Sequence, residues 1–262
     1  MATYHLSVKN GKKGKAVEHA KYISRQGKHR QDGKSDLVVV AHGNLPEWAQ
    51  NNPLAFWRAA DYYERSNGAA YREFELALPN ELNVEQQKDL LNEFIGKQLG
   101  SRPFHVAIHA PPASLGKLPQ PHAHLMFSDR LDDGLNRPPE LHFKRFNAAD
   151  PAIGGCKKVS GGKDRTAMQE MLSAIRQEWA AIQNAFLERA GFDARVDHRS
   201  NRSRKIEKAP ERHLGHVGIK SMSDDEKAQF TARRTLKVES FDTESKRRFD
   251  KPENELDTKL ES

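Results

Sequence analysis

Short stretches that alternate apolar with ionisable residues constrain this fold more than any other feature of the sequence. In "PHAHLMF", His122 and His124 fall on one side of an extended chain, while Leu125 and Phe127 fall on the other. The stretch Ala70–Pro79 alternates in the same way, with phenylalanine and leucines on one side and two glutamates on the other. A period of two is typical of strands, so we expect a sheet with one apolar and one ionisable face.

The remaining periodic segments complete an α+β fold. Three further strands are expected at Thr3–Val8, at Leu37–Gly43 (read as short and buried) and at 104–110. Helices are expected at 14–27 with a Gly27 cap, from Pro53, from Asn83 with a capping box to Gln86, and from about Thr166 to Arg189. Five strands with intervening helices predict a largely antiparallel sheet with helices packed on one face. We expect one domain over residues 1–215 and a charged tail over 216–262, extended or partly helical.

The ionisable face of the predicted sheet collects imidazoles and carboxylates. Its members are His105, His109, His122, His124, Glu73 and Glu75. His109 ends one strand and His122 begins the next, so these two and His124 fit one divalent ion such as Mn²⁺, Mg²⁺ or Zn²⁺. His105 lies two pleats further along its strand, too far to join them. Any one of these histidines alone is more often a local hydrogen-bonding residue, whereas the three together favour a metal.

Tyr22 is the candidate nucleophile in the first predicted helix. At helical spacing it lies near His19 and Arg25, away from the apolar stripe of Ala16, Ala20 and Ile23. A tyrosine beside arginine and lysines is well placed to meet a phosphate. The alternative is an ordinary half-buried tyrosine, which is the usual case.

Charge and composition narrow the class of partner. The chain carries a formal net charge of +7, which indicates an anionic partner or simply a basic soluble surface. The expected DNA-phosphate contacts are Arg25, Lys28, Arg30, Lys34, Arg199, Arg202, Arg204, Lys205, Lys208 and Arg212. Cys156 is the only cysteine, so an intrachain disulfide is excluded. We find no signal peptide and no membrane-spanning run, and expect a cytoplasmic protein without membrane insertion.

Several motifs follow one another in a specific order: "YHLSVK", "HAKYISRQGK", "YREFELALP", "AIHAPP…PHAHLMFSDR" and "PERHLG". Together they resemble the MobA/MobL family of plasmid mobilisation relaxases, a branch of the HUH endonucleases. The resemblance covers roughly residues 1–215. It implies a palm-like relaxase fold and metal-dependent, site- and strand-specific nicking of single-stranded DNA at an origin of transfer, through a 5′-phosphotyrosyl intermediate that is later rejoined.

The resemblance also assigns roles to individual positions. Tyr22 matches the catalytic tyrosine of the family, the histidine triplet matches its metal ligands, and Glu73 and Glu75 match acidic positions near that centre. Some relatives have a second tyrosine where this chain has His29, so a single nucleophile would both cut and reseal. Expected partners are the origin DNA, accessory mobilisation proteins and a type IV secretion coupling protein, with transfer of the protein to a recipient cell.

Three other functions remain open on the residues alone. A rolling-circle replication initiator uses the same chemistry, but in many families its tyrosine follows the histidine motif, whereas Tyr22 precedes it. A basic nucleic-acid-binding protein with a structural metal would show no cleavage. A hydrolytic metallophosphodiesterase would use water in place of tyrosine.

Overall fold

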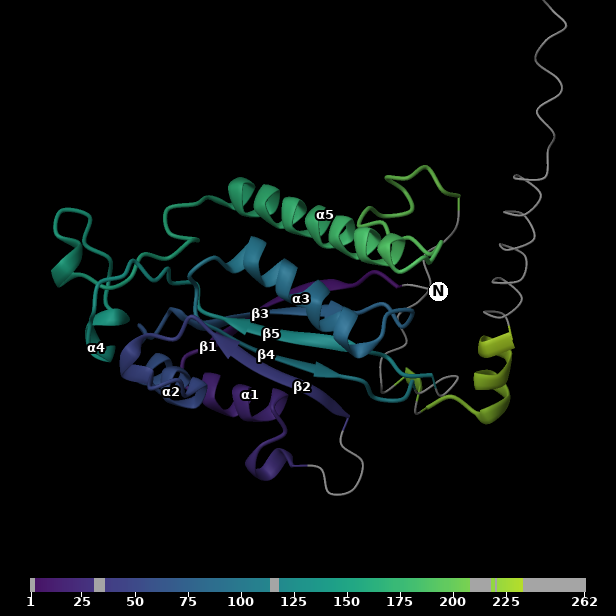
Figure 1. The fold of residues 1–262 in the computed structure, drawn as a ribbon, viewed down its shortest axis with the longest axis horizontal. Helices are drawn as coiled ribbons and strands as arrows, with labels where there is room; N and C mark the ends of the chain where they lie inside the picture. Colours follow the sequence, from purple (N-terminus) through teal and green to yellow (C-terminus); the bar gives the residue numbers. More distant parts are fainter. Residues whose placement is uncertain (1–2, 31–35, 114–117, 208–217, 220, 233–262) are drawn as a thin grey trace, which may run out of the picture. The chain divides into compact units, whose positions relative to one another are not determined.

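One antiparallel sheet organises the chain (Figure 1). The structure, a computed structural model, describes residues 3–30, 36–113, 118–207, 218–219 and 221–232. The strands are β1 (Leu6–Lys12), β2 (Leu37–Gly43), β3 (Ala69–Ala77), β4 (Phe104–His109) and β5 (His122–Phe127). Within the described residues they lie in the order β1-β3-β5-β4-β2, and every neighbouring pair is antiparallel. The predicted five-stranded antiparallel sheet and α+β class are confirmed.

Helices cover both faces of this sheet, which corrects the expectation of helices on one face. The α-helices are α1 (Ala16–Ile23), α2 (Pro53–Tyr63), α3 (Val84–Leu99), α4 (Pro139–His142) and α5 (Arg165–Arg189), with 3₁₀ turns at Gly27–His29, Glu47–Ala49 and Pro151–Ile153. Helices α3 and α5 pack on one face, and α1 and α2 lie across the other (Figure 1). The second face also carries Tyr71, Ala107 and Met126, which give α1 and α2 an apolar surface to cover. Its ionisable groups are therefore confined to places between and beside these helices.

The two edge strands differ from their sequence-based descriptions. Strand β2 was expected to be buried, but it pairs only with β4, and Val38 and Val40 are exposed by 41% and 42%. Strand β1 begins at Leu6, later than the predicted Thr3, and continues past the predicted end at Val8 to Lys12. Gly11 makes this possible, because a Cβ there would lie 1.8 Å from a ring atom of Tyr71.

Helix ends follow local hydrogen-bonding rules. The capping box of α3 is present, with the Asn83 and Gln86 side chains each bonding to the other's backbone N–H. Helix α5 agrees closely with its predicted range. Helix α1 is shorter than predicted: it ends at Ile23, and Arg25 already has a left-handed backbone, with φ of 53°. The cap expected at Gly27 therefore lies beyond the helix end.

The C-terminal part of the chain is described only in short stretches. Residues 224–232 are helical within the predicted tail, and most of 216–262 lies outside the described residues. By Cα proximity, residues 1–111 and 119–208 form one compact unit, and 112–118 with 209–262 form another. No helix in the described part of the chain has both the length and the apolar character of a membrane span.

Candidate metal centre and nucleophile

Three imidazoles meet where strands β4 and β5 pair. His109 lies directly opposite His122 in the antiparallel register, and His124 follows on the same face of β5. The ring centroids are 5.1–5.5 Å apart. Each ring offers one nitrogen, and these three atoms lie within 4.8 Å of one another. The strands therefore bring together the three histidines expected from the sequence, and within the described residues His105 is not part of this group.

Hydrogen bonds at the rim of the group fix which nitrogen of each ring is free. His122 Nδ1 lies 2.9 Å from the carbonyl oxygen of Gln120, and His124 Nδ1 lies 2.6 Å from a carboxylate oxygen of Glu73. Both partners only accept, so these nitrogens donate and each Nε2 keeps its lone pair. In His109 the relation is reversed, because Nε2 lies 2.7 Å from the carbonyl oxygen of Ile23 and leaves the lone pair on Nδ1.

The protonation of the group suits metal binding. Burial lowers the pKa of His109 to about 4 and also lowers the pKa of His122. Neutral imidazoles are the form that coordinates a cation. Three imidazole donors, each oriented by a hydrogen bond at the ring's other nitrogen, fit a divalent metal ion with coordination positions left open.

Glu73 acts as the support of His124. Its carboxylate is 1% exposed, and its second oxygen lies 3.0 Å from Nε2 of His19. Although burial opposes it, hydrogen bonding from the two imidazoles holds the pKa of Glu73 at about 2. A carboxylate–histidine pair of this kind fixes the ring orientation and raises the basicity of a metal ligand. Both oxygens of Glu73 are therefore occupied by histidines.

Glu75, the other acidic residue expected at the site, lies opposite His124 in the register between β3 and β5. It forms an ion pair with Lys9 and receives a hydrogen bond of 3.4 Å from Ser7. Although burial opposes it, the hydrogen bond from Lys9 and the charges of Lys9 and His124 together lower the pKa of Glu75. Glu75 is thus ionised and bound to β1.

Tyr22 lies beside the histidine group. The centroid of its ring lies 6.4 Å from that of His124, and the two rings meet edge-on. Tyr22 is 42% exposed. His29 approaches the same ring edge-on at 5.5 Å, and His19 lies roughly parallel at 6.0 Å. The structure therefore brings Tyr22 and the candidate ligands together from segments about a hundred residues apart.

Helix α1 holds Tyr22 in place through contacts at both ends. At its start, the carboxylate of Asp61 in α2 accepts hydrogen bonds from the backbone N–H groups of Ala16 (2.9 Å) and Val17 (3.0 Å). At its end, the carbonyl oxygen of Ile23 receives the bond from His109. Neither contact involves the tyrosine itself, so the position of Tyr22 is set by α2 and by strand β4.

The basic residues near the site differ in how free they are. Lys28 is exposed and lies 2.6 Å from Glu18, and Arg30 is exposed. Arg25 is different, because its side chain is 9% exposed and forms an ion pair with Asp36. Lys34 lies outside the described residues. Lys28 and Arg30 remain open to an incoming phosphate, whereas the contacts of Arg25 are within the protein.

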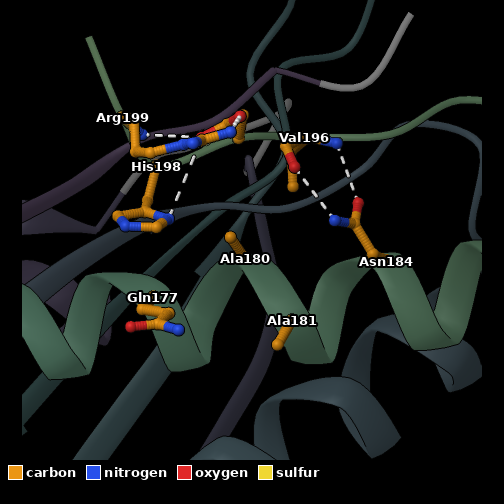
Figure 2. Close-up of a pocket in the computed structure, with 8 residues that line it drawn as sticks. Gln177, Ala180, Ala181, Asn184, Val196, His198 and Arg199 are labelled. Atoms are coloured by element: carbon orange, nitrogen blue, oxygen red, sulfur yellow. Dashed lines mark hydrogen bonds and ion pairs between the residues drawn. The ribbon is translucent and has the colours of Figure 1, made fainter. Parts of the chain in front are cut away.

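The second group of expected DNA contacts begins beside α5. Arg199 and Arg204 are both paired with Asp197, while Arg202 and Lys205 are exposed, and Lys208 and Arg212 lie outside the described residues. Figure 2 shows the amide of Asn184 bonded to the backbone of Val196, beside a groove of about 470 Å³. Helix α5 packs on the face of the sheet opposite the three histidines. Residues 196–199 are thus tied to the other face from Tyr22.

Sequence reasoning missed three residues of this site. His19 was noted only as a neighbour of Tyr22, and nothing in the sequence pairs it with Glu73. Asp36 and Asp61 carry no motif, since each acts on a residue distant in the chain or on backbone groups. The one usable signal was the helical spacing of His19, Tyr22 and Arg25, which correctly placed His19 and Arg25 beside the Tyr22 ring, although Arg25 lies just past the end of α1.

Comparison with known proteins shows the family of this chain. The MobA/MobL family matches residues 11–224. The chain is 45% identical over 209 residues to the 43 kDa relaxation protein of Salmonella typhimurium, covering 79% of this chain and 56% of that protein. It is 40% identical over 220 residues to Mobilization protein A of Escherichia coli, covering 82% of this chain and 30% of that protein. The chain thus spans about half or less of the length of these two relatives.

A solved structure shares the fold. A chain from a study titled "Molecular Basis of Vancomycin Resistance Transfer in Staphylococcus aureus" superposes with a TM-score of 0.54 at 22% identity, covering 76% of this chain and all of that one. At this identity the likeness concerns the fold alone. The family match extends over most of the sheet, the histidine group and Tyr22. This chain belongs to the MobA/MobL family.

Proposed function

We propose that this chain nicks and rejoins single-stranded DNA at a plasmid origin of transfer, by metal-dependent transesterification with Tyr22 as the nucleophile. The observation that carries the proposal is the position of an exposed tyrosine ring 6.4 Å from His124, within a group of three convergent imidazoles. The names of two relatives, a relaxation protein and a mobilization protein, support it. By resemblance to the family, Tyr22 corresponds to its catalytic tyrosine and the three histidines correspond to its metal ligands.

The reaction follows from the chemistry of the groups present. A divalent cation bound by His109, His122 and His124 would neutralise charge on the scissile phosphate and orient it. The oxygen of Tyr22 attacks phosphorus, and the bond from phosphorus to the 3′ oxygen breaks in line with the attack. The products are a 5′-phosphotyrosyl linkage and a free 3′-OH, which takes up a proton. Because one phosphodiester replaces another, the reverse attack by the 3′-OH reseals the strand without an external energy source.

Tyr22 must lose its proton during the attack, since a free phenol has a pKa of about 10. The guanidinium of Arg25 lies 4.9 Å from the centroid of the Tyr22 ring and places a positive charge beside it. Glu73 and Glu75, expected near the centre, are candidate acceptors of that proton. Because both oxygens of Glu73 are bound to histidines, we propose that Glu73 instead acts by orienting His124. Glu75 is held by Lys9 and contributes negative charge near the ligands.

The finer details are also proposals. Imidazole ligands suit Mn²⁺ better than Mg²⁺, which prefers oxygen, so we propose Mn²⁺ first, with Mg²⁺ and Zn²⁺ as alternatives. Lys28, which is exposed although paired with Glu18, and Arg30, which is also exposed, are the proposed contacts for the DNA backbone near Tyr22. Accessory mobilisation proteins, a secretion coupling protein and a cytoplasmic location with transfer to a recipient follow from the family resemblance.

Covalent capture of DNA tests the proposal. Purified protein is incubated with Mn²⁺ or Mg²⁺ and a single-stranded oligonucleotide spanning the origin of transfer, labelled on the 3′ side of the expected nick, and run on a denaturing gel. The expected product is a labelled fragment that migrates with the protein, and Tyr22→Phe should abolish it. Tyr62→Phe is the matched control, because Tyr62 is a 73% exposed tyrosine of α2.

Other outcomes identify other functions. A free 5′-phosphate that persists in Tyr22→Phe would indicate a metal-dependent hydrolase. Intact oligonucleotide together with a band shift in a native gel would indicate a binding protein with a structural metal. Loss of the adduct in His122→Ala with DNA binding retained would support the role of His122 as a ligand.

A further inference from the structure

Arg25 follows Tyr22 by one helical turn and connects the nucleophile with the metal ligands. It lies just past the end of α1 in a left-handed backbone conformation, with φ of 53°. Such a conformation is uncommon for a residue other than glycine, and it costs about 1 kcal/mol or more unless the surroundings favour it. The contacts of the side chain supply that compensation.

Asp36 fixes the guanidinium by a two-pronged ion pair. Arg25 Nε donates to Asp36 Oδ1 at 2.8 Å, and Nη2 donates to Oδ2 at 2.7 Å. The two side chains are 9% and 15% exposed, so solvent screens the pair little. A bidentate arrangement fixes both the position and the plane of the guanidinium. Asp36 immediately precedes β2, which anchors the pair to the sheet.

The anchored guanidinium contacts both halves of the proposed reaction centre. Its Cζ atom lies 4.9 Å from the centroid of the Tyr22 ring, and Nη1 donates to the carbonyl oxygen of Tyr22 at 2.9 Å. On its other side, Nη2 lies 3.3 Å from Nδ1 of His109. All three guanidinium nitrogens are therefore engaged within the protein, which leaves little capacity for a DNA phosphate.

The contact with His109 involves the nitrogen that a metal would need. Since Nε2 of His109 donates to the carbonyl oxygen of Ile23, Nδ1 carries the only lone pair of the ring. An N–H of Arg25 points at that lone pair. A divalent cation and the guanidinium thus compete for one nitrogen, and their positive charges repel each other across a few ångströms.

We propose that Arg25, anchored by Asp36, is a positioning residue that links Tyr22 to His109 and weakens the metal affinity of the centre by competing for the Nδ1 lone pair. The inference rests on the proposed function for its catalytic part, while the competition concerns cation binding alone. Arg25 keeps positive charge beside the tyrosine at the expense of metal affinity. Asp36 has the opposite effect, because its carboxylate both holds the guanidinium and offsets its charge.

Mn²⁺ binding without DNA tests the competition directly. Free Mn²⁺ is measured by electron paramagnetic resonance during titration of the whole chain and its variants. Arg25→Gln is expected to bind Mn²⁺ about tenfold more tightly, and Asp36→Asn several-fold more weakly, because one removes a nearby positive charge and the other a nearby negative charge. Arg25→Lys keeps the charge and is expected to stay near the affinity of the unchanged protein.

A second arginine–aspartate pair provides the matched control. Arg137 is 1% exposed in its side chain and bonds to both oxygens of Asp133, away from the histidine group. Asp133→Asn should lower the melting temperature without changing Mn²⁺ affinity. If both pairs only support the fold, Arg25→Gln and Asp36→Asn will lower stability and change Mn²⁺ affinity in the same direction or not at all. Unchanged or weaker binding in Arg25→Gln overturns the proposal.

The nicking assay separates this inference from the proposed function. In Arg25→Gln the maximal rate of adduct formation at saturating Mn²⁺ should fall about tenfold, with the KM for the oligonucleotide nearly unchanged, since Arg25 orients Tyr22 and does not hold DNA. A rise in KM alone would instead make Arg25 a DNA contact. If the unchanged protein forms no adduct, the proposed function fails, whereas the order of Mn²⁺ affinities still decides the competition.

Discussion

The two ends of strand β5 carry buried ionisable groups that are satisfied in different ways. Just past its C-terminal end, Arg130 donates to both oxygens of Glu64 and to the carbonyl oxygens of Phe143, Lys144 and Cys156. At its N-terminal end, the three histidines are bonded at their outer nitrogens; the Nε2 atoms of His122 and His124 keep their lone pairs, while the inner Nδ1 of His109 meets an N–H of Arg25. Charge is buried at both ends. Only one end retains groups able to bind a ligand.

The hydrogen bonds that remain unmade, and not the types of residue, distinguish the structural cluster around Arg130 from the candidate binding site formed by the histidines. Arg130 and Glu64 are 2% exposed, and their donors and acceptors are used within the protein. Such a cluster fixes the loops that follow β5 onto the end of α2. Where acceptors remain after every internal bond has been counted, as in the histidine group, a partner from outside the chain is needed.

Arg130→Met should produce the largest loss of stability. The change removes the guanidinium and leaves Glu64 buried with Lys158 and Arg65 as its remaining partners. Breaking a buried pair in this way costs about 3–5 kcal/mol of unfolding free energy. Urea denaturation measures it, and a loss below about 1 kcal/mol would mean that the C-terminal end of β5 is not a structural cluster.

His124→Ala, at the other end of β5, should mainly lower Mn²⁺ affinity and change stability less. We expect Mn²⁺ affinity to fall by more than ~100-fold, beyond the loss typical of residues that merely support a ligand. The unfolding free energy without metal should change less than in Arg130→Met, since the ring is bonded only to Glu73. Calorimetric titration with Mn²⁺, paired with urea denaturation, gives both quantities. Unchanged affinity would exclude His124 as a ligand.

Glu73→Gln and Glu75→Gln form a matched pair with smaller effects. Glu73 orients His124 and is buried, so its loss should lower Mn²⁺ affinity about 10–100-fold. Glu75 interacts with Lys9 and should matter less than tenfold. Equal effects of the two substitutions on Mn²⁺ binding would contradict the role assigned to Glu73.

His105 sharpens the comparison with the smallest effect, a pH dependence. It lies on β4, is 1% exposed, and within the described residues neither ring nitrogen has a hydrogen-bond partner. Burial lowers its pKa from 6.5 to about 4. Between these two values the unfolded chain binds a proton that the folded chain does not, so stability falls as the pH falls from 6.5 to 4.

Removing the titrating group should flatten this dependence. In His105→Phe, the slope of unfolding free energy against pH over this range should be shallower by up to about 1.4 kcal/mol per pH unit. Urea denaturation at several pH values measures the slope. An unchanged slope would show that His105 does not contribute, whatever the stability of the variant at neutral pH.

The sequence predicted the sheet and the grouping of the three histidines well, because both depend on local periodicity. Alternation placed His122 and His124 on one face, and strand pairing brought His109 opposite His122. The covering of the second face by α1 and α2 was missed, since Ala107 and Met126 look unremarkable between ionisable neighbours. Edge position was also missed for β2, because a run of valines reads the same in the middle or at the edge of a sheet.

Long-range polar pairing could not be predicted from the sequence. Arg25 and Asp36 are both common charged residues, and their fork depends on the left-handed turn after α1. Arg25 was expected to contact DNA because of its charge, whereas its side chain is 9% exposed and forms an ion pair with Asp36. A charge pattern identifies a basic side chain but not its partner, because the partner depends on tertiary contacts between segments distant in the sequence.

The short length of α1 has a consequence for when the protein becomes reactive. A helix of eight residues has almost no stability in isolation. Its shape depends on Asp61 of α2 at one end and on His109 of β4 at the other. Only a chain whose distant segments have already come together can present the phenol in a defined direction, so the proposed attack of Tyr22 on DNA requires the folded molecule.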